Sequence, residues 1–159
     1  MADILVTYFS KTGHTKAMAQ CIGRAAREVE GVRVEVRPVE DVAPDDLLDF
    51  DGIVMGSPVY YGTMAAPLKA LIDESVRHHG KLEGKVGGAF SSSGVIGGGN
   101  ETTLLDIIGC QLVHGMIVKG EPKGPHYGPT CQGAPNDEAH EHCEDYGRDI
   151  AELCVRLFG

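Results

Sequence analysis

The stretch Val6–Gln20, VTYFSKTGHTKAMAQ, changes character abruptly in its middle. An apolar run ends at Ser10, a short segment of hydroxyl residues around one glycine follows, and apolar residues then recur at helical spacing. A buried strand that passes directly into a helix leaves the first amides of that helix without intrahelical partners. The pattern therefore predicts a strand, a polar loop, and a helix whose N-terminus is available to an anion.

The length and composition fit one globular domain covering residues 1–159. The chain has 159 residues, of which 42% are hydrophobic, and its formal net charge is −9. No apolar run approaches the ~20 residues of a membrane span, and the N-terminus lacks the basic region of a signal peptide. We therefore expect a cytoplasmic protein that binds neither membrane nor nucleic acid, since nucleic acid requires basic patches. The acidic charge fits a solvated surface or docking onto a basic partner protein.

Apolar runs and helical spacing alternate along the chain. Strands are predicted at 3–9, 32–39, 52–56, 85–90 and 116–119. Helices are predicted at 14–28, 66–79, 100–112 and 136–158, with a helical turn at 44–48 and a loop at 119–134. This alternation is typical of a parallel sheet with helices on both faces. Such sheets bind ligands beyond the carboxyl ends of their strands, so we expect the loops after the first, third and fourth strands to carry the function.

The first of these loops, SKTGHT at 10–15, has the chemistry of a phosphate cradle. It offers the hydroxyls of Ser10, Thr12 and Thr15 beside free amides, and Gly13 lets the backbone curl around an anion. The motifs of ATP-type P-loops and of dinucleotide-binding folds are both absent. A cradle of neutral donors is one interpretation. The other is an ordinary helix with Thr12 or Ser10 as its N-cap.

The second and third loops offer aromatic faces and backbone donors. Tyr60 and Tyr61, in GSPVYYGT at 56–63, are suited to a flat aromatic ligand, or alternatively to covering a helix or a partner subunit. The segment SSSGVIGGG at 91–99 lets the backbone approach a ligand closely, although flexible surface loops have a similar composition.

Taken in order, these loops resemble those of the flavodoxin-like family, which binds FMN. The first resembles the family's [ST]-x-T-G-x-T phosphate pattern, and GSPVYYGTMAAPLKALID resembles its isoalloxazine loop and following helix. The segments SSSGVIGGGNETTL, VHGMIV and HYGPT resemble the NAD(P)H:quinone oxidoreductase branch related to tryptophan-repressor-binding protein. The resemblance implies a flavodoxin-like α/β three-layer sandwich, with a five-stranded parallel sheet in the order 2-1-3-4-5.

The resemblance also implies a set of site residues. The residues implied to hold the FMN phosphate are Ser10, Lys11, Thr12, Gly13, His14 and Thr15. Those implied to line the ring are Pro58, Val59, Tyr60, Tyr61, Gly62, Ser91, Ser92, Ser93, Gly94, Val95 and Gly98. His114 falls where the quinone-reductase branch has a histidine near the flavin, and is the catalytic candidate; a satisfied polar residue at a helix end is the alternative.

The implied function is FMN-dependent electron transfer from NAD(P)H to a quinone or similar acceptor. Many one-electron flavodoxins cover the ring with a Trp and a Tyr, whereas this chain has no Trp and offers Val95 and Ile96 where such a Tyr is expected. An open ring face favours a reductase. The alternatives are a flavodoxin that carries single electrons between redox partner proteins, which suits the acidic charge, and a module of the same fold without flavin. Self-association into a homo-oligomer is left open, because the 119–134 segment is shorter than the branch's insertion.

The remaining His, Cys and acidic residues are not assigned to a metal site. The sequence HEHCE at 140–144 contains ligand-type residues, but Cys143 falls on the apolar stripe of the last helix, so no metal site is predicted. The five cysteines are scattered without a C-x-x-C pair, which predicts buried free thiols.

Overall fold

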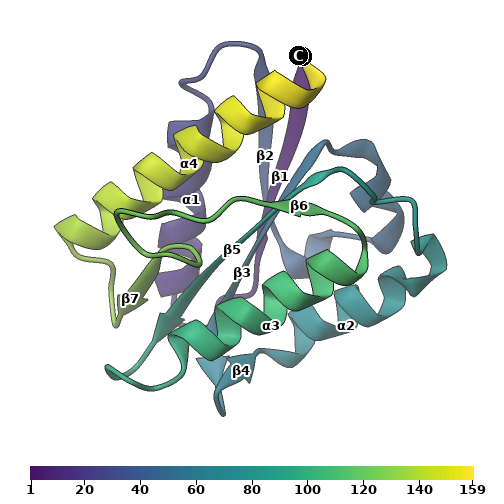
Figure 1. Ribbon diagram of the computed structural model, residues 1–159. Helices are drawn as coiled ribbons and strands as arrows, with labels where there is room; N and C mark the ends of the chain where they lie inside the picture. The colour runs from purple at the N-terminus through teal and green to yellow at the C-terminus, as the bar shows by residue number, and fades with distance from the viewer.

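A largely parallel sheet forms the centre of the computed structural model, which describes residues 1–159 (Figure 1). Its five central strands lie in the order β2-β1-β3-β5-β6. They are β1 (Ala2–Tyr8), β2 (Val32–Pro38), β3 (Gly52–Tyr60), β5 (Val86–Ser93) and β6 (Ile117–Val118). Two short strands lie off this path: β4 (Thr63–Met64), antiparallel to β3, and β7 (Thr130–Gln132), parallel to β5. The predicted order is confirmed, since the fourth and fifth strands of the prediction are β5 and β6.

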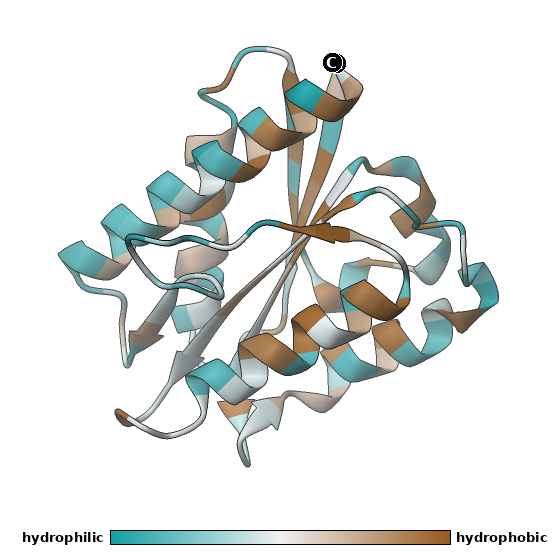
Figure 2. Ribbon diagram, in the orientation of Figure 1, coloured by the Kyte–Doolittle hydropathy of each residue, from teal (hydrophilic) through white to brown (hydrophobic).

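Helices cover both faces of the sheet. α1 (His14–Ala26) and α4 (Asp137–Phe158) lie on one face, and α2 (Ala66–Glu74) and α3 (Asn100–Val113) on the other. Short 3₁₀ helices follow at Val39–Asp41, Pro44–Asp49 and Ser75–His78. Ile4 and Leu5 are both fully buried, and they belong to the two separate core clusters on opposite faces. Two-sided burial explains the continuous apolar run of β1 and the hydrophobic colouring of the central strands in Figure 2.

The edge strand beside β5 is split in two. β6 pairs with the start of β5 and β7 with its end, so the 119–134 segment is not entirely a loop as predicted. In the gap, the amide of Ala89 donates to the Tyr146 hydroxyl at 2.9 Å. Gly128 passes the same residue so closely that a Cβ there would lie 2.0 Å from the Ala89 carbonyl oxygen. The Tyr146 hydroxyl thus takes the place of a ladder acceptor for Ala89, and the glycine lets the 128 backbone pass close to β5.

Two strands extend further than predicted, and one helix is shorter. β3 continues from Gly56 to Tyr60, and β5 continues from Phe90 to Ser93. The extension follows from pairing, because β5 ends between β3 and β7, each of which supplies ladder partners. α2 ends at Glu74 and gives way to a 3₁₀ turn, whereas the prediction continued the helix to residue 79.

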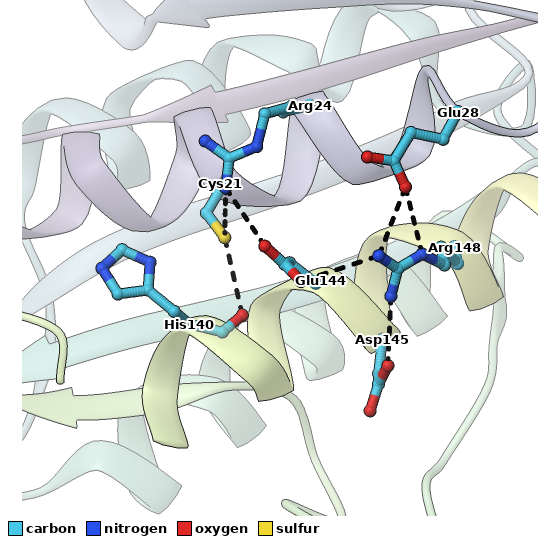
Figure 3. Close-up of polar contacts among 7 residues, drawn as sticks. All are labelled: Cys21, Arg24, Glu28, His140, Glu144, Asp145 and Arg148. Atoms are coloured by element: carbon cyan, nitrogen blue, oxygen red, sulfur yellow. Dashed lines mark hydrogen bonds and ion pairs between the residues drawn. The ribbon is translucent and has the colours of Figure 1, made fainter. Parts of the chain in front are cut away.

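Polar contacts join α1 to α4 along their exposed side (Figure 3). The Arg148 guanidinium lies 3.2 Å from the Glu28 carboxylate and 3.6 Å from that of Glu144, and Arg24 lies 3.2 Å from Glu144. Exposed pairs of this kind each contribute at most about 1 kcal/mol. The main attachment of α1 is therefore the apolar core beneath, which holds its N-terminus at the carboxyl edge of the sheet.

The thiols are part of that core. Cys21, Cys131, Cys143 and Cys154 are buried and Cys110 is half-buried, which confirms the prediction for four of the five. Burial raises the pKa of Cys131 to about 11 and that of Cys154 to about 12. These thiols therefore remain protonated and unreactive near neutral pH. None of the helices combines the length and apolar character that a membrane span requires.

Candidate functional site

The first turn of α1 has no side-chain cap. Gly13 is the N-cap residue, with φ of 96° and no side-chain hydrogen bond to the helix. The Ser10 hydroxyl accepts from the Gly13 amide at 3.2 Å, so the alternative of Thr12 or Ser10 as N-cap is wrong. The helix amides left without a partner within the chain are those of His14, Thr15 and Lys16. Free donors at the positive end of a helix dipole, beside the exposed Thr12 and the half-buried Ser10, form an anion site.

A hydrogen bond between side chains connects the first loop to the end of β5. The Thr15 and Ser92 hydroxyl oxygens are 2.9 Å apart, and the two residues are only 2% and 5% exposed. The register of the sheet pairs Pro58 with Ser92, which brings the end of β3 to the same place. These contacts bring the loops after β1, β3 and β5 together at one edge of the sheet.

The two tyrosines of the second loop have different surroundings. The Tyr60 ring packs edge-on against Phe9, with the ring centroids 6.2 Å apart. Tyr61 is fully exposed and is the one residue other than glycine with a positive φ, at 51°. Left-handed backbone at a residue with a bulky side chain costs free energy and is often found at ligand sites. Tyr61 is thus entirely free to contact a ligand, whereas Tyr60 packs against Phe9 and is 41% exposed.

Ser57 fixes the base of this loop, a role that its position in the sequence did not reveal. Its hydroxyl donates to the Pro58 carbonyl and accepts from the Ala65 amide, both at 2.8 Å. Ser57 is fully buried, so these contacts are protected from water. They connect the end of β3 to the start of α2.

The third loop is organised by Asn100, which sequence reasoning treated only as the start of a helix. The Ser91 hydroxyl donates to the Asn100 side-chain oxygen at 2.7 Å, and the Asn100 amide donates to the Ser93 hydroxyl at 2.9 Å. The Ser93 hydroxyl then donates to the Val95 carbonyl at 3.0 Å. A lone Asn after a glycine run gives no sequence signal for such a bridge, because the loop must fold back to bring it against the end of β5.

The predicted residues of the third loop fall into two groups: those that support the loop and those that are exposed at the edge. Ser91 is fully buried and its amide donates to the Pro129 carbonyl, so the structure gives it a supporting place and not one facing the edge. The Gly98 amide donates to the Val95 carbonyl and closes the loop. Val95 and Ile96 are 65% and 86% exposed. Exposed apolar side chains beside an anion site are suited to cover an apolar ring.

His114 is not brought to this edge, which corrects the expectation that it lies near a flavin. It follows α3, whose 14 residues span about 21 Å from the third loop. There its Nε2 lies 2.8 Å from the Ser75 hydroxyl. Burial, together with the charges of His79 and His78, lowers the pKa of His114. The alternative, a polar residue at a helix end, describes its place, although only Nε2 has a partner and Nδ1 is buried without one.

A groove of about 530 Å³ lies between α4 and the 121–129 segment. Its lining contains one arginine, one lysine and one histidine among six carboxylates. These carboxylates are Glu121, Glu138, Glu141, Asp145, Asp149 and Glu152. An excess of negative charge repels phosphate groups, so this groove is no candidate for a nucleotide cofactor.

The doubly wound sheet and the neutral anion cradle at its carboxyl edge define a flavodoxin-like α/β protein. The family described as NADPH-dependent FMN reductase matches residues 42–123. A flavodoxin of Aquifex aeolicus is 35% identical and covers 96% of this chain and 86% of its own. An NAD(P)H dehydrogenase (quinone) of Archaeoglobus fulgidus is 32% identical, and the alignment covers 99% of this chain and 100% of the relative. The chain belongs to this FMN-binding, flavodoxin-like family of oxidoreductases.

Solved structures agree with this assignment. An archaeal flavodoxin superimposes with a TM-score of 0.81 at 30% identity, covering 96% of this chain and 99% of its own. A WrbA-like flavodoxin from Agrobacterium tumefaciens gives a TM-score of 0.83 at 23% identity and 99% coverage of both, which shows the fold. The residues present fit FMN, since the free amides of α1 suit its phosphate and the exposed Tyr61 suits its ring.

Proposed function

We propose that this protein transfers electrons from NAD(P)H to a quinone or similar acceptor at bound FMN. The observation that carries the proposal is the uncapped N-terminus of α1 on the same edge as the exposed Tyr61 and Val95. Support for the donor and acceptor comes from relatives in Archaeoglobus fulgidus and Rhodopseudomonas palustris named NAD(P)H dehydrogenase (quinone), each covered over its full length.

The first loop is assigned to the FMN phosphate. The free amides of His14 and Thr15 and the hydroxyls of Ser10 and Thr12 donate to the phosphate oxygens. Lys11 is exposed beside them and adds a long-range attraction that salt will screen. Gly13 gives the loop its left-handed turn, so the phosphate can approach the backbone.

The second and third loops are assigned to the ring. Tyr61 covers one face, Pro58, Val59 and Gly62 follow its edge, and Ser92, Ser93, Gly94 and Val95 border the other end. The chain offers no tryptophan for the second face. We expect the nicotinamide and the acceptor to use that open face in turn.

When bound, FMN supplies the redox chemistry: it takes a hydride from NAD(P)H and passes two electrons to the quinone, which takes up two protons. The residues of this chain bind and orient the reactants. The edge is open to water, which can supply these protons, so no side-chain acid is required. His114, the candidate from the sequence, lies far from this edge.

Anaerobic mixing of the FMN-loaded protein with NADH or NADPH tests the proposal. We expect the visible flavin absorbance to fall with at least one of them and to return when a soluble benzoquinone is added. Loss of absorbance with neither nucleotide, from a protein that holds FMN, contradicts it. The variant Lys123→Ala, which removes a cation from the acidic groove and none from the first loop, is the control and should react as the native protein does.

The second candidate is a one-electron carrier, and the acidic groove along α4 favours it. The groove borders a smaller hollow of about 200 Å³ beside β7, whose lining includes Thr130 and Gln132, and β7 pairs with the end of β5. A basic redox protein can therefore dock close to the ring edge. Reduction by such a protein that is slowed strongly by salt, without NAD(P)H activity, favours this candidate.

A further inference from the structure

The turn that joins β3 to β4 lies at the ring edge of the candidate site. Tyr61 and Gly62 are its central residues, with φ of 51° and 78°, and Tyr60 pairs with Thr63 across it. Positive φ at both central residues is the signature of a type I′ hairpin turn. Such a turn is favoured by Asn-Gly and tolerates Tyr poorly, so neighbouring contacts must stabilise it.

The first turn of α3 supplies those contacts. The Thr102 hydroxyl lies 2.6 Å from the Gly62 carbonyl oxygen and 3.0 Å from the Gly99 carbonyl oxygen. Gly99 also approaches so closely that a Cβ there would lie 2.9 Å from the Gly62 Cα. The helix start and the hairpin turn are therefore in backbone contact, and one hydroxyl bridges them.

The neighbouring peptide has no such partner. No hydrogen bond within the chain involves the Tyr61 carbonyl or the Gly62 amide. The bond to the Gly62 carbonyl holds the peptide that follows the Gly62 Cα. The preceding peptide, between Tyr61 and Gly62, keeps its carbonyl and its amide without partners in the chain. Since Tyr61 is fully exposed, this peptide is open to a ligand.

We propose that Thr102 is a positioning residue for the flavin: its hydroxyl holds the Gly62 carbonyl and thereby sets how the Tyr61–Gly62 peptide meets the ring. The inference rests on the proposed FMN site. A hydroxyl has one proton, and Thr102 has two carbonyl acceptors within reach. If the turn adjusts to the oxidation state of the ring, the Thr102 hydroxyl can rotate and donate to the Gly99 carbonyl instead. Its hydrogen bond is then exchanged and not lost.

The test compares three variants of the hairpin and helix. Thr102→Val keeps the shape and removes the donor, whereas Thr102→Ser keeps the donor. Thr63→Val removes a different tether between the same elements, because the Thr63 hydroxyl donates to the Asp106 carboxylate at 2.6 Å. That bond is charge-assisted and so at least as strong, but it holds a side chain and not the turn carbonyl.

Two measurements apply to each variant: amide hydrogen exchange of Thr63, which pairs with Tyr60 across the turn, without FMN, and the reduction potential of bound FMN. In Thr102→Val we expect exchange to accelerate about two- to tenfold, and the protein's preference between oxidised and reduced FMN to change by a similar factor. Thr102→Ser should stay within about twofold of the native protein, and Thr63→Val should leave the potential unchanged.

Native exchange and native potential in Thr102→Val would overturn the inference, as would an equal shift of potential in Thr63→Val. The proposed function fails separately. A native protein that binds no FMN refutes the cofactor site, whereas the exchange rates still report whether Thr102 holds the turn.

Discussion

The hydroxyl oxygens of Thr15 and Ser92 lie 2.9 Å apart, although the two residues are 77 positions apart in the chain. Thr15 belongs to the first turn of α1 and Ser92 to the end of β5. This bond therefore fixes the proposed phosphate loop relative to the strand that precedes the third loop. Both residues are buried, so loss of either hydroxyl leaves the other without its partner.

A double-mutant cycle measures this bond. Thr15→Val alone should lower the free energy of unfolding by about 1–2 kcal/mol, because the Ser92 hydroxyl is left unsatisfied. Adding Ser92→Ala should cost little more, which gives a coupling of about 1 kcal/mol in urea unfolding of the apo-protein. Additive effects of the two substitutions would show that the hydroxyls do not interact.

Gly13→Ala should weaken FMN binding through the backbone. The φ of Gly13 is 96°, and nothing lies within 4 Å of an added Cβ, so the cost is conformational and not steric. We expect a loss of stability of roughly 1–2 kcal/mol and a weaker FMN affinity, measured by quenching of flavin fluorescence. Gly109→Ala is the control: it also meets open space, but within α3, where alanine should stabilise by about 0.5–1 kcal/mol. Equal FMN affinities in the two variants would contradict the assignment of the first loop.

The strand order and the functional edge could be predicted because each depends on patterns local in the sequence. Ile4 and Leu5 are consecutive apolar residues that reach opposite core clusters, and such two-sided burial is typical of a parallel strand. The loop at Gly13 could be found for the same reason, since a glycine between hydroxyls at the change from strand to helix has a local physical meaning.

Contacts between distant segments could not be predicted. Ser91 becomes a strand residue because Ser57 and Thr130 pair with it on its two sides, and no local pattern announces the return of Thr130. The bridge through Asn100 spans only seven to nine positions, but it depends on the glycine loop folding back onto the end of β5, which no local pattern shows. His114 is different, because the predicted helix at 100–112 already implied about 20 Å between it and the third loop. The resemblance placed this residue near a flavin, and the length of the helix contradicts that placement.

The Asn100 bridge predicts a strict requirement for an amide. Asn100→Asp keeps an acceptor for the Ser91 hydroxyl but removes the donor to Ser93 and buries a charge, since Asn100 is 8% exposed. We expect a loss of about 1–3 kcal/mol in unfolding free energy, together with a shifted flavin spectrum.

Asn136 provides the control for this substitution. Its side chain accepts from the Ala139 amide at 2.9 Å as the N-cap of α4, where only an acceptor is needed. Asn136→Asp should therefore be neutral or slightly stabilising. A neutral Asn100→Asp would show that the Ser93 hydroxyl finds another donor.

His114 should matter for stability at low pH and not for turnover. The Ser75 hydroxyl donates to the Ile72 carbonyl at 2.6 Å, so it accepts from Nε2 of His114, and Nδ1 is left buried without a partner. Burial, and then the nearby charges of His79 and His78, lower the pKa of His114 in the folded protein. The unfolded chain, with a pKa of about 6.5, therefore binds this proton more readily.

The contribution of neutral His114 to stability should thus be complete above about pH 6.5 and be lost as the pH falls through that value toward the lower folded pKa. Urea unfolding between pH 8 and 5 should show this loss in the native protein and a flatter dependence in His114→Gln. The same variant should keep its rate of NAD(P)H-dependent quinone reduction, because residue 114 lies about 21 Å from the flavin edge along α3. An unchanged pH dependence would refute the buried neutral imidazole, and a tenfold slower rate would return His114 to the catalytic site.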